Sequence, residues 1–249
     1  MTMSSVALIT GAARRIGRAL ALHLARQGWH IAAHYHHSAD EAGSLASEVQ
    51  ALGGQCITLQ ADLENMAEVE SLLPRASSAL GAVTLLVNNA AVFERDSLAT
   101  FSPAAWQRHH TINHLVPLVL IQGMARALPD GQSGNVVNLL DGNWGWSLSG
   151  DFFSYTSSKL GLRSMSEYLA SLLAPRIRIN GIALGLTIPG HQEKTDTFSR
   201  VASSAPLQRL NTVDDVLAAF DYFLAATSVT GEVIEIGSGL HLRWSHHSY

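Results

Sequence analysis

Tyr155 and Lys159 are the side chains whose types and spacing first indicate chemistry. Positions i and i+4 of a helix lie on one face, so a helix here would place the phenol beside the ammonium. A free tyrosine titrates near pH 10 and is a poor acid–base catalyst at neutral pH, whereas a close cation favours its ionised form. The pair predicts a proton-transferring tyrosine, although taken alone it also fits a solvated helix face.

Two further polar residues lie in or beside segments that are otherwise apolar. Asp141 follows the predicted strand 135–140, where it is either a turn residue before Gly142 or a partner in the chemistry. Asn113 lies in the predicted helix 112–128 among apolar neighbours, which predicts burial. A buried asparagine needs hydrogen-bond partners, so it is either a structural cross-link or part of a proton path.

The N-terminal stretch predicts a site for the phosphates of a nucleotide. Residues 6–9 indicate a buried parallel strand, Thr10-Gly11 ends it, and a helical pattern starts near Arg18. In such a turn Gly11 lets backbone N–H groups approach a pyrophosphate, and Gly17 lets the helix pack closely on the strand. Tight strand-to-helix turns use glycine in any case, so this turn alone is a weak signal.

The predicted second strand, residues 29–33, ends in the polar run His34-Tyr35-His36-His37-Ser38. In a dinucleotide-binding fold this strand end faces the adenosine ribose, where an Asp or Glu accepts from the 2′-hydroxyl of NAD. No carboxylate stands in this run, and imidazoles with a serine hydroxyl can instead donate to a 2′-phosphate, which predicts NADP. The alternative is a polar loop that happens to carry histidines.

Asp62 follows the predicted strand 56–60 and has two interpretations. At a strand end its carboxylate can accept from the adenine amino group. Equally, it can cap the helix that follows.

Strands and helices alternate along the chain with short connections, which predicts a parallel sheet covered by helices on both faces. The expected strands are residues 6–9, 29–33, 56–60, 83–87, 135–140, 176–182 and 232–236. The expected helices include 39–52, 103–109, 112–128, a long helix opened by Tyr155, and one from a capping box of Thr212 and Asp215 to Ala226. No repeat or linker marks a second domain, so residues 1–249 are predicted to form a single-domain, doubly wound α/β protein, a Rossmann fold.

The composition favours a folded, cytoplasmic protein. Hydrophobic residues make up 47% of the 249 residues and charged ones 14%, which is ample for a large core. A net charge of −4 gives no reason to expect nucleic acid or an anionic membrane as partner, and we find no signal peptide or membrane-spanning run. The single cysteine, Cys56, cannot form an internal disulfide. No carboxylate or thiol is arranged with His109, His110 and His114, so no metal site is predicted.

Taken together, these residues resemble the short-chain dehydrogenase/reductase family over nearly the whole chain. The matching motifs are Thr10-Gly11 with Ile16-Gly17, Asp62, Asn88-Asn89-Ala90, Asn113, Tyr155-Thr-Ser-Ser-Lys159, and Asn180-Gly181 before Gly185. In that family the tyrosine relays a proton while a nicotinamide delivers hydride, the lysine holds the nicotinamide ribose, and the asparagine holds a water in the proton path. The resemblance implies these roles for Tyr155, Lys159 and Asn113.

Three departures from the common family pattern resemble the pteridine reductases, a branch of the family. Arg15 stands where most members have glycine, and Asp141 stands where the common pattern has serine. Residues 34–38 resemble a His-Tyr-His-Arg-Ser loop that binds the NADP phosphate, with His37 in place of the arginine. Phe93 matches the phenylalanine that sandwiches a pterin against the nicotinamide.

A pterin suits these residue types because it is a flat heterocycle with a polar edge. An aromatic ring can stack on it while Arg15 meets its acceptor atoms. The resemblance implies that Tyr155, or a water near Asp141, protonates the ring nitrogen beside the carbon that is reduced.

The sequence thus predicts an NADPH-dependent reductase that converts a dihydropterin or dihydrofolate to its tetrahydro form. Two alternatives stay open, an NADP-dependent oxidoreductase of another small carbonyl or hydroxyl compound and a non-catalytic NADP-binding sensor. The predicted catalytic residues are Tyr155, Lys159, Asp141 and Asn113, and the predicted substrate-binding residues are Arg15, Phe93, Asp141 and Tyr155. The residues predicted to bind NADP are Gly11, Arg14, Arg15, Ile16, Gly17, His34, Tyr35, His36, His37, Ser38, Asp62, Leu63, Asn89, Ala90, Lys159 and Gly185.

Further expectations concern assembly and the C-terminal part of the chain. The apolar faces of the helices that carry Asn113 and Tyr155 predict a homotetramer or a dimer. The irregular segment at about 186–207 is expected to be the substrate loop. The tail after Gly237, with its Trp244 and Tyr249, is expected to reach the pocket of a neighbouring subunit.

Overall fold

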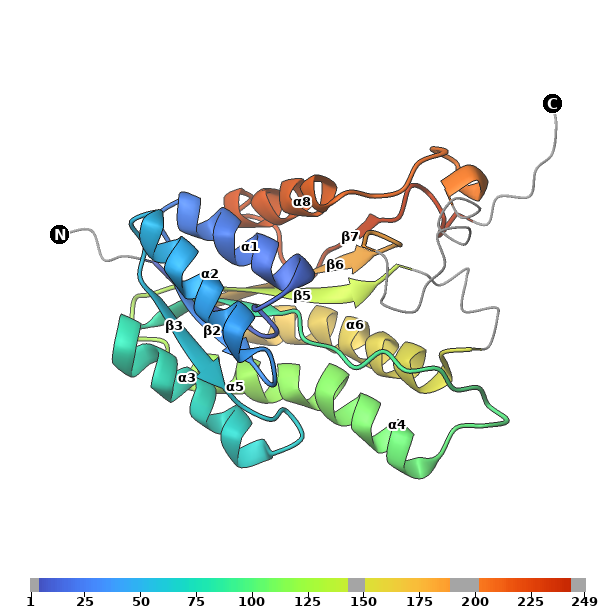
Figure 1. The fold of residues 1–249 in the computed structure, drawn as a ribbon, viewed down its shortest axis with the longest axis horizontal. Helices are drawn as coiled ribbons and strands as arrows, with labels where there is room; N and C mark the ends of the chain where they lie inside the picture. Colours follow the sequence, from blue (N-terminus) through green and yellow to red (C-terminus); the bar gives the residue numbers. More distant parts are fainter. Residues whose placement is uncertain (1–4, 143–150, 189–201, 243–249) are drawn as a thin grey trace.

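Parallel strands form one sheet at the centre of the protein (Figure 1). The structure is a computed structural model, and it describes residues 5–142, 151–188 and 202–242. Over these residues the sheet has seven strands in the order β3-β2-β1-β4-β5-β6-β7, each parallel to its neighbours. Their bounds are Val6–Ile9 (β1), His30–Tyr35 (β2), Cys56–Gln60 (β3), Val83–Asn88 (β4), Gly134–Asp141 (β5), Ile177–Leu184 (β6) and Val233–Ile236 (β7).

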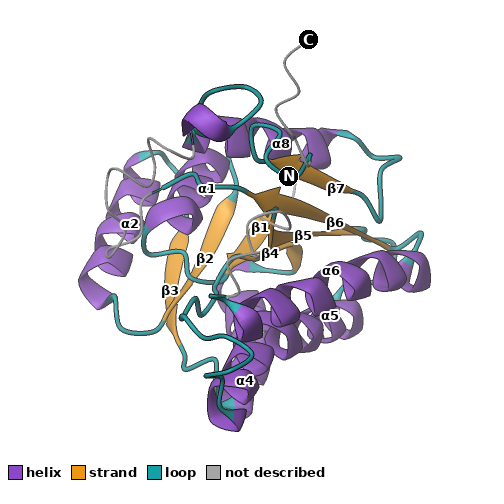
Figure 2. Cartoon of the chain, turned by 90° about the vertical axis from the view of Figure 1, so that its right-hand side faces the viewer, coloured by secondary structure: helices purple, strands orange, loops and turns teal. Residues whose placement is uncertain are grey.

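Helices cover both faces of this sheet (Figures 1 and 2). The helices α1, α2 and α8 pack on one face and α3, α5 and α6 on the other, each set enclosing an apolar core against the strands. Their bounds are Arg15–Arg26 (α1), Ala39–Ala51 (α2), Met66–Leu80 (α3), Pro103–His110 (α4), Thr111–Leu115 (the π-turn η1), Val116–Ala127 (α5), Phe153–Leu173 (α6) and Val213–Ala225 (α8). The predicted doubly wound α/β fold is therefore confirmed.

The strands are mostly apolar because helices cover both of their faces. All four residues of β1 are buried, as are six of the eight residues of β5. The polar exceptions pair with one another: Asn88 of β4 donates to Asn138 of β5 (2.7 Å), and Asn138 donates to Ser166 of α6 (2.8 Å). These buried bonds fix α6, the helix of Tyr155, against β5.

Three differences from the predicted element boundaries bear on the site. The helix α1 begins at Arg15 rather than near Arg18. The strand β2 continues to Tyr35 because His34 and Tyr35 still pair with β3. The helix predicted at 112–128 begins as the π-turn η1, which follows α4 directly, and Asn113 lies in that turn. By contrast, the predicted capping box of Thr212 and Asp215 is present at the start of α8.

The sheet changes its winding direction between β1 and β4. From β1 the chain moves outward to β2 and β3, and it then returns to place β4 on the other side of β1. Ligands of open α/β sheets bind in the crevice at the carboxyl ends of the strands beside such a switch point. None of the described helices is both long and apolar enough to cross a membrane.

Candidate active site

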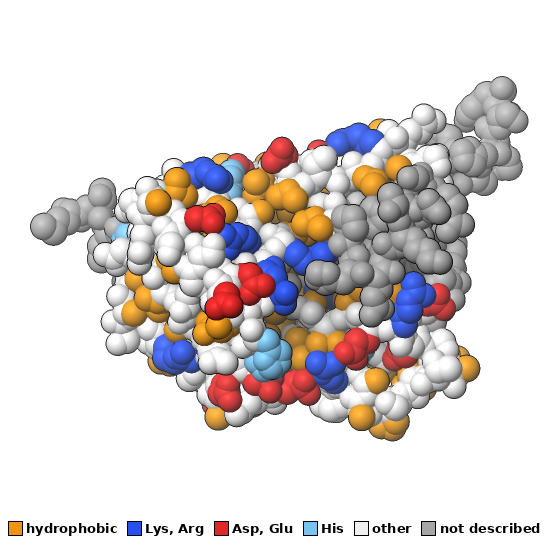
Figure 3. Space-filling model, viewed as in Figure 1, with side chains coloured by type: hydrophobic (Ala, Val, Ile, Leu, Met, Phe, Trp, Pro, Cys, Tyr) orange, Lys and Arg blue, Asp and Glu red, His pale blue; other side chains and the backbone are white. Residues whose placement is uncertain are grey.

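A cleft of about 590 Å³ opens at the carboxyl ends of the strands, along the hollowed face that Figure 3 shows between the two helix layers. It extends from the turn after β1, past the ends of β2 and β3, to the end of β5 and the first turn of α6. The predicted site residues that line it are Gly11, Arg14, Arg15, Ile16, His34, Tyr35, His36, His37, Ser38, Asp62, Leu63, Asn89, Ala90, Phe93, Asp141, Tyr155, Lys159 and Gly185. The two other predicted residues, Gly17 and Asn113, are buried and do not line the cleft.

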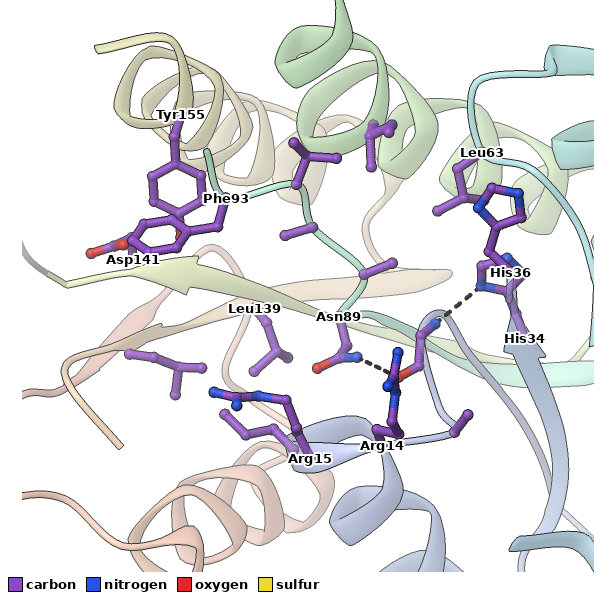
Figure 4. Close-up of a pocket in the computed structure, with 18 of the residues that line it drawn as sticks. Arg14, Arg15, His34, His36, Leu63, Asn89, Phe93, Leu139, Asp141 and Tyr155 are labelled. Atoms are coloured by element: carbon purple, nitrogen blue, oxygen red, sulfur yellow. Dashed lines mark hydrogen bonds between the residues drawn. The ribbon is translucent and has the colours of Figure 1, made fainter. Parts of the chain in front are cut away.

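The turn between β1 and α1 is packed closely around its glycines. Gly11 has a φ of +64°, a left-handed conformation that glycine adopts at little cost. A Cβ atom on Gly17 would lie 2.3 Å from the carbonyl oxygen of Gly11 and 2.6 Å from Nδ2 of Asn89. The Asn89 amide donates to the carbonyl oxygens of Thr10 (2.8 Å) and Gly11 (3.1 Å), the second of which Figure 4 marks. Glycine is therefore needed at position 17, and Asn89 holds the turn in place.

The side chain of His34 holds this turn in place through hydrogen bonds and does not face a phosphate. It is 2% exposed, its Nδ1 accepts from the N–H of Gly11 (3.0 Å), and its Nε2 lies 3.1 Å from the carbonyl oxygen of Ala61 (Figure 4). Burial lowers the pKa of His34 to about 4, so the ring is neutral at physiological pH. The expectation that His34 donates to a 2′-phosphate is wrong, because β2 carries it into the sheet. The N–H of Gly11, being bound to His34, is likewise not directed at a pyrophosphate.

Arg15 lines the cleft, and its backbone has a strained conformation. Its φ is +55°, which costs an L residue roughly 1–2 kcal/mol relative to glycine. Its guanidinium donates to the carbonyl oxygen of Ile188 (2.9 Å), in the segment that follows β6. The side chain therefore lies across the cleft from the strand-end residues, where Figure 4 shows it.

The rim of the cleft beyond β2 carries polar and charged groups. The rings of His36 and His37 stack with their centroids 3.5 Å apart. Ser38 is the N-cap residue of α2, but its hydroxyl makes no capping hydrogen bond. Arg14 lies on the neighbouring turn, with its guanidinium 3.7 Å from the carboxylate of Glu41.

The structure tests one of the two interpretations of Asp62, that it caps the helix α3. The cap of α3 is Asn65, whose side chain accepts from the N–H of Ala67 (3.2 Å). Asp62 accepts instead from the N–H of Glu64 (2.9 Å) and lies on the wall of the cleft. The helix-capping interpretation is wrong, and a contact with adenine stays a prediction.

Tyr155 and Asp141 meet at the other end of the cleft (Figure 4). Asp141 is the last residue of β5 and Tyr155 lies in the first turn of α6, where the phenol is hydrogen-bonded to the carboxylate. Burial, together with the charge and the hydrogen bond of Asp141, raises the pKa of Tyr155 well above its usual value. The sequence-based expectation of a tyrosine ionised by a close lysine is therefore wrong for this structure: the phenol stays protonated.

Lys159 lies one turn further along α6 and is almost fully buried. Its Nζ donates to the carbonyl oxygen of Leu139 (2.7 Å), which fixes the ammonium at the end of β5. Burial lowers the pKa of Lys159 to about 8, although the charge of Asp141 opposes the shift. The ammonium therefore stays charged at neutral pH, close to the point where Tyr155 and Asp141 meet.

Asn113 is a structural cross-link through its side chain. The amide accepts from the N–H of Val92 (2.8 Å) and donates to the carbonyl oxygen of Val92 (2.9 Å) and to the hydroxyl of Ser158 (3.0 Å). It therefore ties the segment after β4 to the catalytic face of α6. Of the alternatives left open by the sequence, the side-chain contacts favour the cross-link.

Aromatic rings cover the Tyr155–Asp141 end of the cleft. Phe93 is 53% exposed, meets the ring of Tyr155 edge-on at 4.6 Å, and stacks on Phe152 at 4.3 Å. The guanidinium of Arg95 lies over Phe152, 5.1 Å from its centroid. Phe93 lines the cleft and its stacking on a pterin stays a prediction, whereas Phe152 was not among the residues that the sequence indicated.

Asp96 is a further residue that sequence reasoning missed. Its carboxylate accepts from the N–H (2.9 Å) and the hydroxyl of Ser154, in the first turn of α6. A strand-type bridge between Asp96 and Phe152 runs beside these bonds. Since Asp96 and Ser154 are 58 positions apart, no local spacing pattern could have indicated the contact.

Among the described residues, no group of three or more His, Cys, Asp or Glu side chains is arranged to hold a metal ion. The ring of His109 is buried, lying 2.8 Å from the carbonyl oxygen of Ala105 and accepting from the N–H of Glu94. His110 stacks on Trp106, with ring centroids 4.3 Å apart. Trp144, Trp146, Trp244, Tyr249 and most of the predicted substrate loop lie outside the described residues.

Comparison with known proteins identifies the family. Residues 5–199 match the family model described as short chain dehydrogenase. The chain belongs to the short-chain dehydrogenase family. A curated relative of this short-chain dehydrogenase, a 3-oxoacyl acyl-carrier-protein reductase of Staphylococcus epidermidis, is 27% identical and matches over 96% of this chain and 100% of its own. An uncharacterized oxidoreductase of Methylorubrum extorquens is 30% identical over 94% of this chain and 97% of its own.

Solved structures of short-chain dehydrogenases superpose closely on this one. FolM alternative dihydrofolate reductase 1 from Brucella canis, complexed with NADP, has a TM-score of 0.93 at 39% identity and covers 98% of this chain and 97% of its own. A blue fluorescent protein from a metagenomic library, in complex with NADPH, has a TM-score of 0.87 at 27% identity, with 96% and 99% covered.

The cleft of this short-chain dehydrogenase fits a nicotinamide cofactor. The turn between β1 and α1 leaves no space for a Cβ on Gly17, as expected where a turn is packed tightly beneath a phosphate. Arg14, His36 and His37 line one part of the cleft and Lys159 another, so the first group would hold the adenosine end of a bound cofactor and Lys159 its nicotinamide end. The predicted nicotinamide cofactor is confirmed by the family, and the choice of NADP agrees with the solved structures.

Proposed function

We propose that this short-chain dehydrogenase is an NADPH-dependent reductase of a pterin, converting a dihydropterin or dihydrofolate to the tetrahydro form. The observation that carries the proposal is the Tyr155–Asp141 hydrogen bond beneath the exposed ring of Phe93. A ketone needs one proton donor at its oxygen, whereas a pterin also presents an amino edge that a carboxylate can accept from. Similarity to the alternative dihydrofolate reductase named above supports the same choice.

The chain's own residues supply the proton and hold the acceptor. When bound, the reduced nicotinamide supplies the hydride. Tyr155 stays protonated because burial and Asp141 raise its pKa, so the phenol is a proton donor at neutral pH. Phe93 offers an exposed ring for stacking, and Arg15 holds a cation across the cleft for the acceptor atoms of the heterocycle. The proton reaches the ring nitrogen from Tyr155, directly or through a water beside Asp141.

NADPH consumption with a panel of acceptors tests the proposal. Dihydrobiopterin, dihydromonapterin and dihydrofolate are compared with a 3-oxoacyl thioester and simple ketones, and Tyr155→Phe serves as the inactive control. We expect kcat/KM for at least one pterin to exceed that for every carbonyl by about a hundredfold. Turnover of carbonyls with inert pterins would contradict the proposal, as would tight NADP binding without turnover of any acceptor, the behaviour of a sensor.

A carbonyl substrate is the second candidate, because curated relatives at 27% identity are 3-oxoacyl acyl-carrier-protein reductases. That reaction would use the same Tyr155 and Lys159. Asp141 distinguishes the two candidate substrates. Its carboxylate accepts the hydrogen bond of the Tyr155 phenol and places a negative charge where a carbonyl oxygen would have to approach.

We also propose that the chain assembles as a homotetramer or a dimer through α5 and α6. Large apolar side chains on α6 and on η1, the turn before α5, are strongly exposed: Leu115 (44%), Leu160 (44%), Tyr168 (61%) and Leu172 (61%). Sedimentation at micromolar concentration should show an oligomer that Leu172→Lys weakens. Leu52→Lys, at the end of α2 and 43% exposed, is the matched control and should leave assembly unchanged. A monomer in the wild-type protein would contradict the proposal.

A further inference from the structure

The ring of Phe93 is exposed, although it belongs to a segment that has to be held in place. Phe93 is 53% exposed and lies beside the ring of Tyr155, as Figure 4 shows. Residues 89–95, which follow β4, form neither helix nor strand. Such a segment has no regular ladder of backbone hydrogen bonds, so its position depends on the side chains that bind its N–H and carbonyl groups.

Two buried side chains hold the backbone on either side of Phe93. Before it, the amide of Asn113 accepts from the N–H of Val92 (2.8 Å) and donates to its carbonyl oxygen (2.9 Å). After it, Nε2 of His109 accepts from the N–H of Glu94 (3.3 Å). Asn113 and His109 are both fully buried and stand four positions apart, where α4 continues into η1. One helical stretch therefore fixes both neighbours of the exposed ring.

The two nitrogens of the His109 ring have different partners, and each partner assigns a role. The carbonyl oxygen of Ala105, 2.8 Å from Nδ1, can only accept, so Nδ1 carries the hydrogen. The N–H of Glu94 can only donate, so Nε2 is the acceptor. A backbone N–H that loses its acceptor costs more than a typical hydrogen bond contributes, so the ring strongly favours this position of Glu94.

The carboxylate of Glu94 has a separate partner in the neighbouring residue Arg108. The guanidinium of Arg108 contacts this carboxylate and lies 2.8 Å from that of Glu64, after β3. These side chains are between 41% and 52% exposed. Exposed ion pairs contribute little, so the buried bond to His109 is the contact that fixes the backbone here.

The segment is fixed again at Asp96. Its carboxylate accepts from the N–H (2.9 Å) and the hydroxyl of Ser154. With Val92 and Asp96 both held, loss of the His109 contact releases the residues between them. Of these, Phe93 is the one that lines the cleft.

We propose that His109 is a positioning residue for the substrate: by holding the N–H of Glu94 it keeps the ring of Phe93 beside Tyr155, where a flat acceptor stacks. This rests on the proposed function, in which a pterin stacks on Phe93. His109 itself does not line the cleft, so it acts on the substrate through Phe93. A ring that is already held loses less conformational freedom on binding, so the contribution of His109 is to affinity for the acceptor.

Two substitutions of similar size separate the two hydrogen bonds of His109. In His109→Asn the amide still donates to Ala105 but is too short to reach Glu94, whereas in His109→Gln the longer side chain accepts from Glu94 and gives up Ala105. The dissociation constant of oxidised biopterin is measured by quenching of its fluorescence in the NADP-saturated protein. We expect it to rise about five- to tenfold in His109→Asn and less than about twofold in His109→Gln. The dissociation constant of NADP should stay unchanged in both.

A double-mutant cycle with Phe93→Leu shows whether the effect passes through the ring. If it does, adding His109→Asn to Phe93→Leu should leave the dissociation constant of biopterin unchanged. Hydrogen exchange tests the backbone contact without any substrate. The N–H of Glu94 should be protected in the wild-type protein and in His109→Gln, and it should exchange faster in His109→Asn.

Equal losses of biopterin affinity in His109→Asn and His109→Gln would overturn the inference, because a general structural role would not distinguish the two variants. A loss that persists beside Phe93→Leu, a matching loss of NADP affinity, or rapid exchange at Glu94 in the wild-type protein would also overturn it. Failure of the pterin proposal would show differently, as a wild-type protein that binds no biopterin while exchange at Glu94 still distinguishes the two variants. The cycle is then measured with the acceptor that the NADPH-consumption panel identifies, and the same outcomes decide it.

Discussion

The phenol of Tyr155 is hydrogen-bonded to the carboxylate of Asp141, which joins the first turn of α6 to the last residue of β5. Two acid groups sharing a hydrogen bond favour a state in which one of them holds the proton. Here burial and the negative charge of Asp141 raise the pKa of Tyr155, so the phenol holds it. The site is thus prepared to donate a proton from the phenol and to accept a hydrogen bond at the carboxylate.

Replacing Asp141 by Asn should separate these two roles. The amide keeps the shape but removes the charge, so the pKa of Tyr155 should fall toward its usual value while pterin reduction falls about a hundredfold or more. Ultraviolet difference titration of the phenol and steady-state kinetics measure the two effects. Asp130→Asn, at an exposed position after α5, is the control for loss of one surface charge. Unchanged pterin kinetics in Asp141→Asn would contradict the assigned role.

Gly17→Ala should disrupt the turn between β1 and α1. The new Cβ would lie 2.3 Å from the carbonyl oxygen of Gly11, a main-chain atom that cannot move without shifting the turn. We expect a loss of about 1–3 kcal/mol in the free energy of unfolding and a large loss of cofactor affinity. Urea denaturation and NADPH titration measure these.

Gly43→Ala is the matched control for that variant, since Gly43 lies within α2 and a Cβ there meets nothing within 4 Å. In an open helical position alanine is favoured over glycine by about 1 kcal/mol, so this variant should be more stable than the wild type. If both variants lost stability equally, close packing would not be the reason for glycine at position 17.

Much of this arrangement could be predicted because parallel strands and their turns have strong local patterns. The buried runs around Val6–Ile9 and Val83–Asn88 indicated strands, and their order placed the site at the carboxyl edge. Gly17 was likewise expected from its position in the turn. These features depend on residues close together in the chain.

The parts that could not be predicted depend on contacts between distant segments. His34 was expected to donate to a 2′-phosphate at the adenosine ribose, but pairing with β3 extends β2 and draws the ring into the interior. The direction of the Tyr155 pKa shift depends on how deeply the phenol is enclosed, which the spacing of Tyr155 and Lys159 does not reveal. Asp96 caps α6 from a loop 58 positions away.

The stability contributed by Lys159 should vary with pH. Its pKa in the folded protein is lowered to about 8 from 10.5, so the buried ammonium costs stability at neutral pH. The folded state releases its proton before the unfolded state does, and stability therefore rises with pH between these two values. Relative to Lys159→Met, the wild-type free energy of unfolding should increase by up to roughly 3 kcal/mol between pH 8 and 10.5. Urea denaturation of both proteins across that range measures this, and a difference that stays level would contradict the shift.

Variants of Arg15 should separate the cost of its backbone conformation from the contribution of its guanidinium to binding. At a φ of +55° glycine avoids a cost that alanine and arginine share, so Arg15→Gly should be about 1 kcal/mol more stable than Arg15→Ala. Both variants lose the guanidinium that lies across the cleft, so both should raise KM for the pterin by a similar factor. Thermal unfolding and pterin saturation curves measure the two quantities on the same pair of proteins. If glycine restored the wild-type KM, the backbone conformation rather than the guanidinium would be what Arg15 contributes, and its place among the substrate-binding residues would be lost.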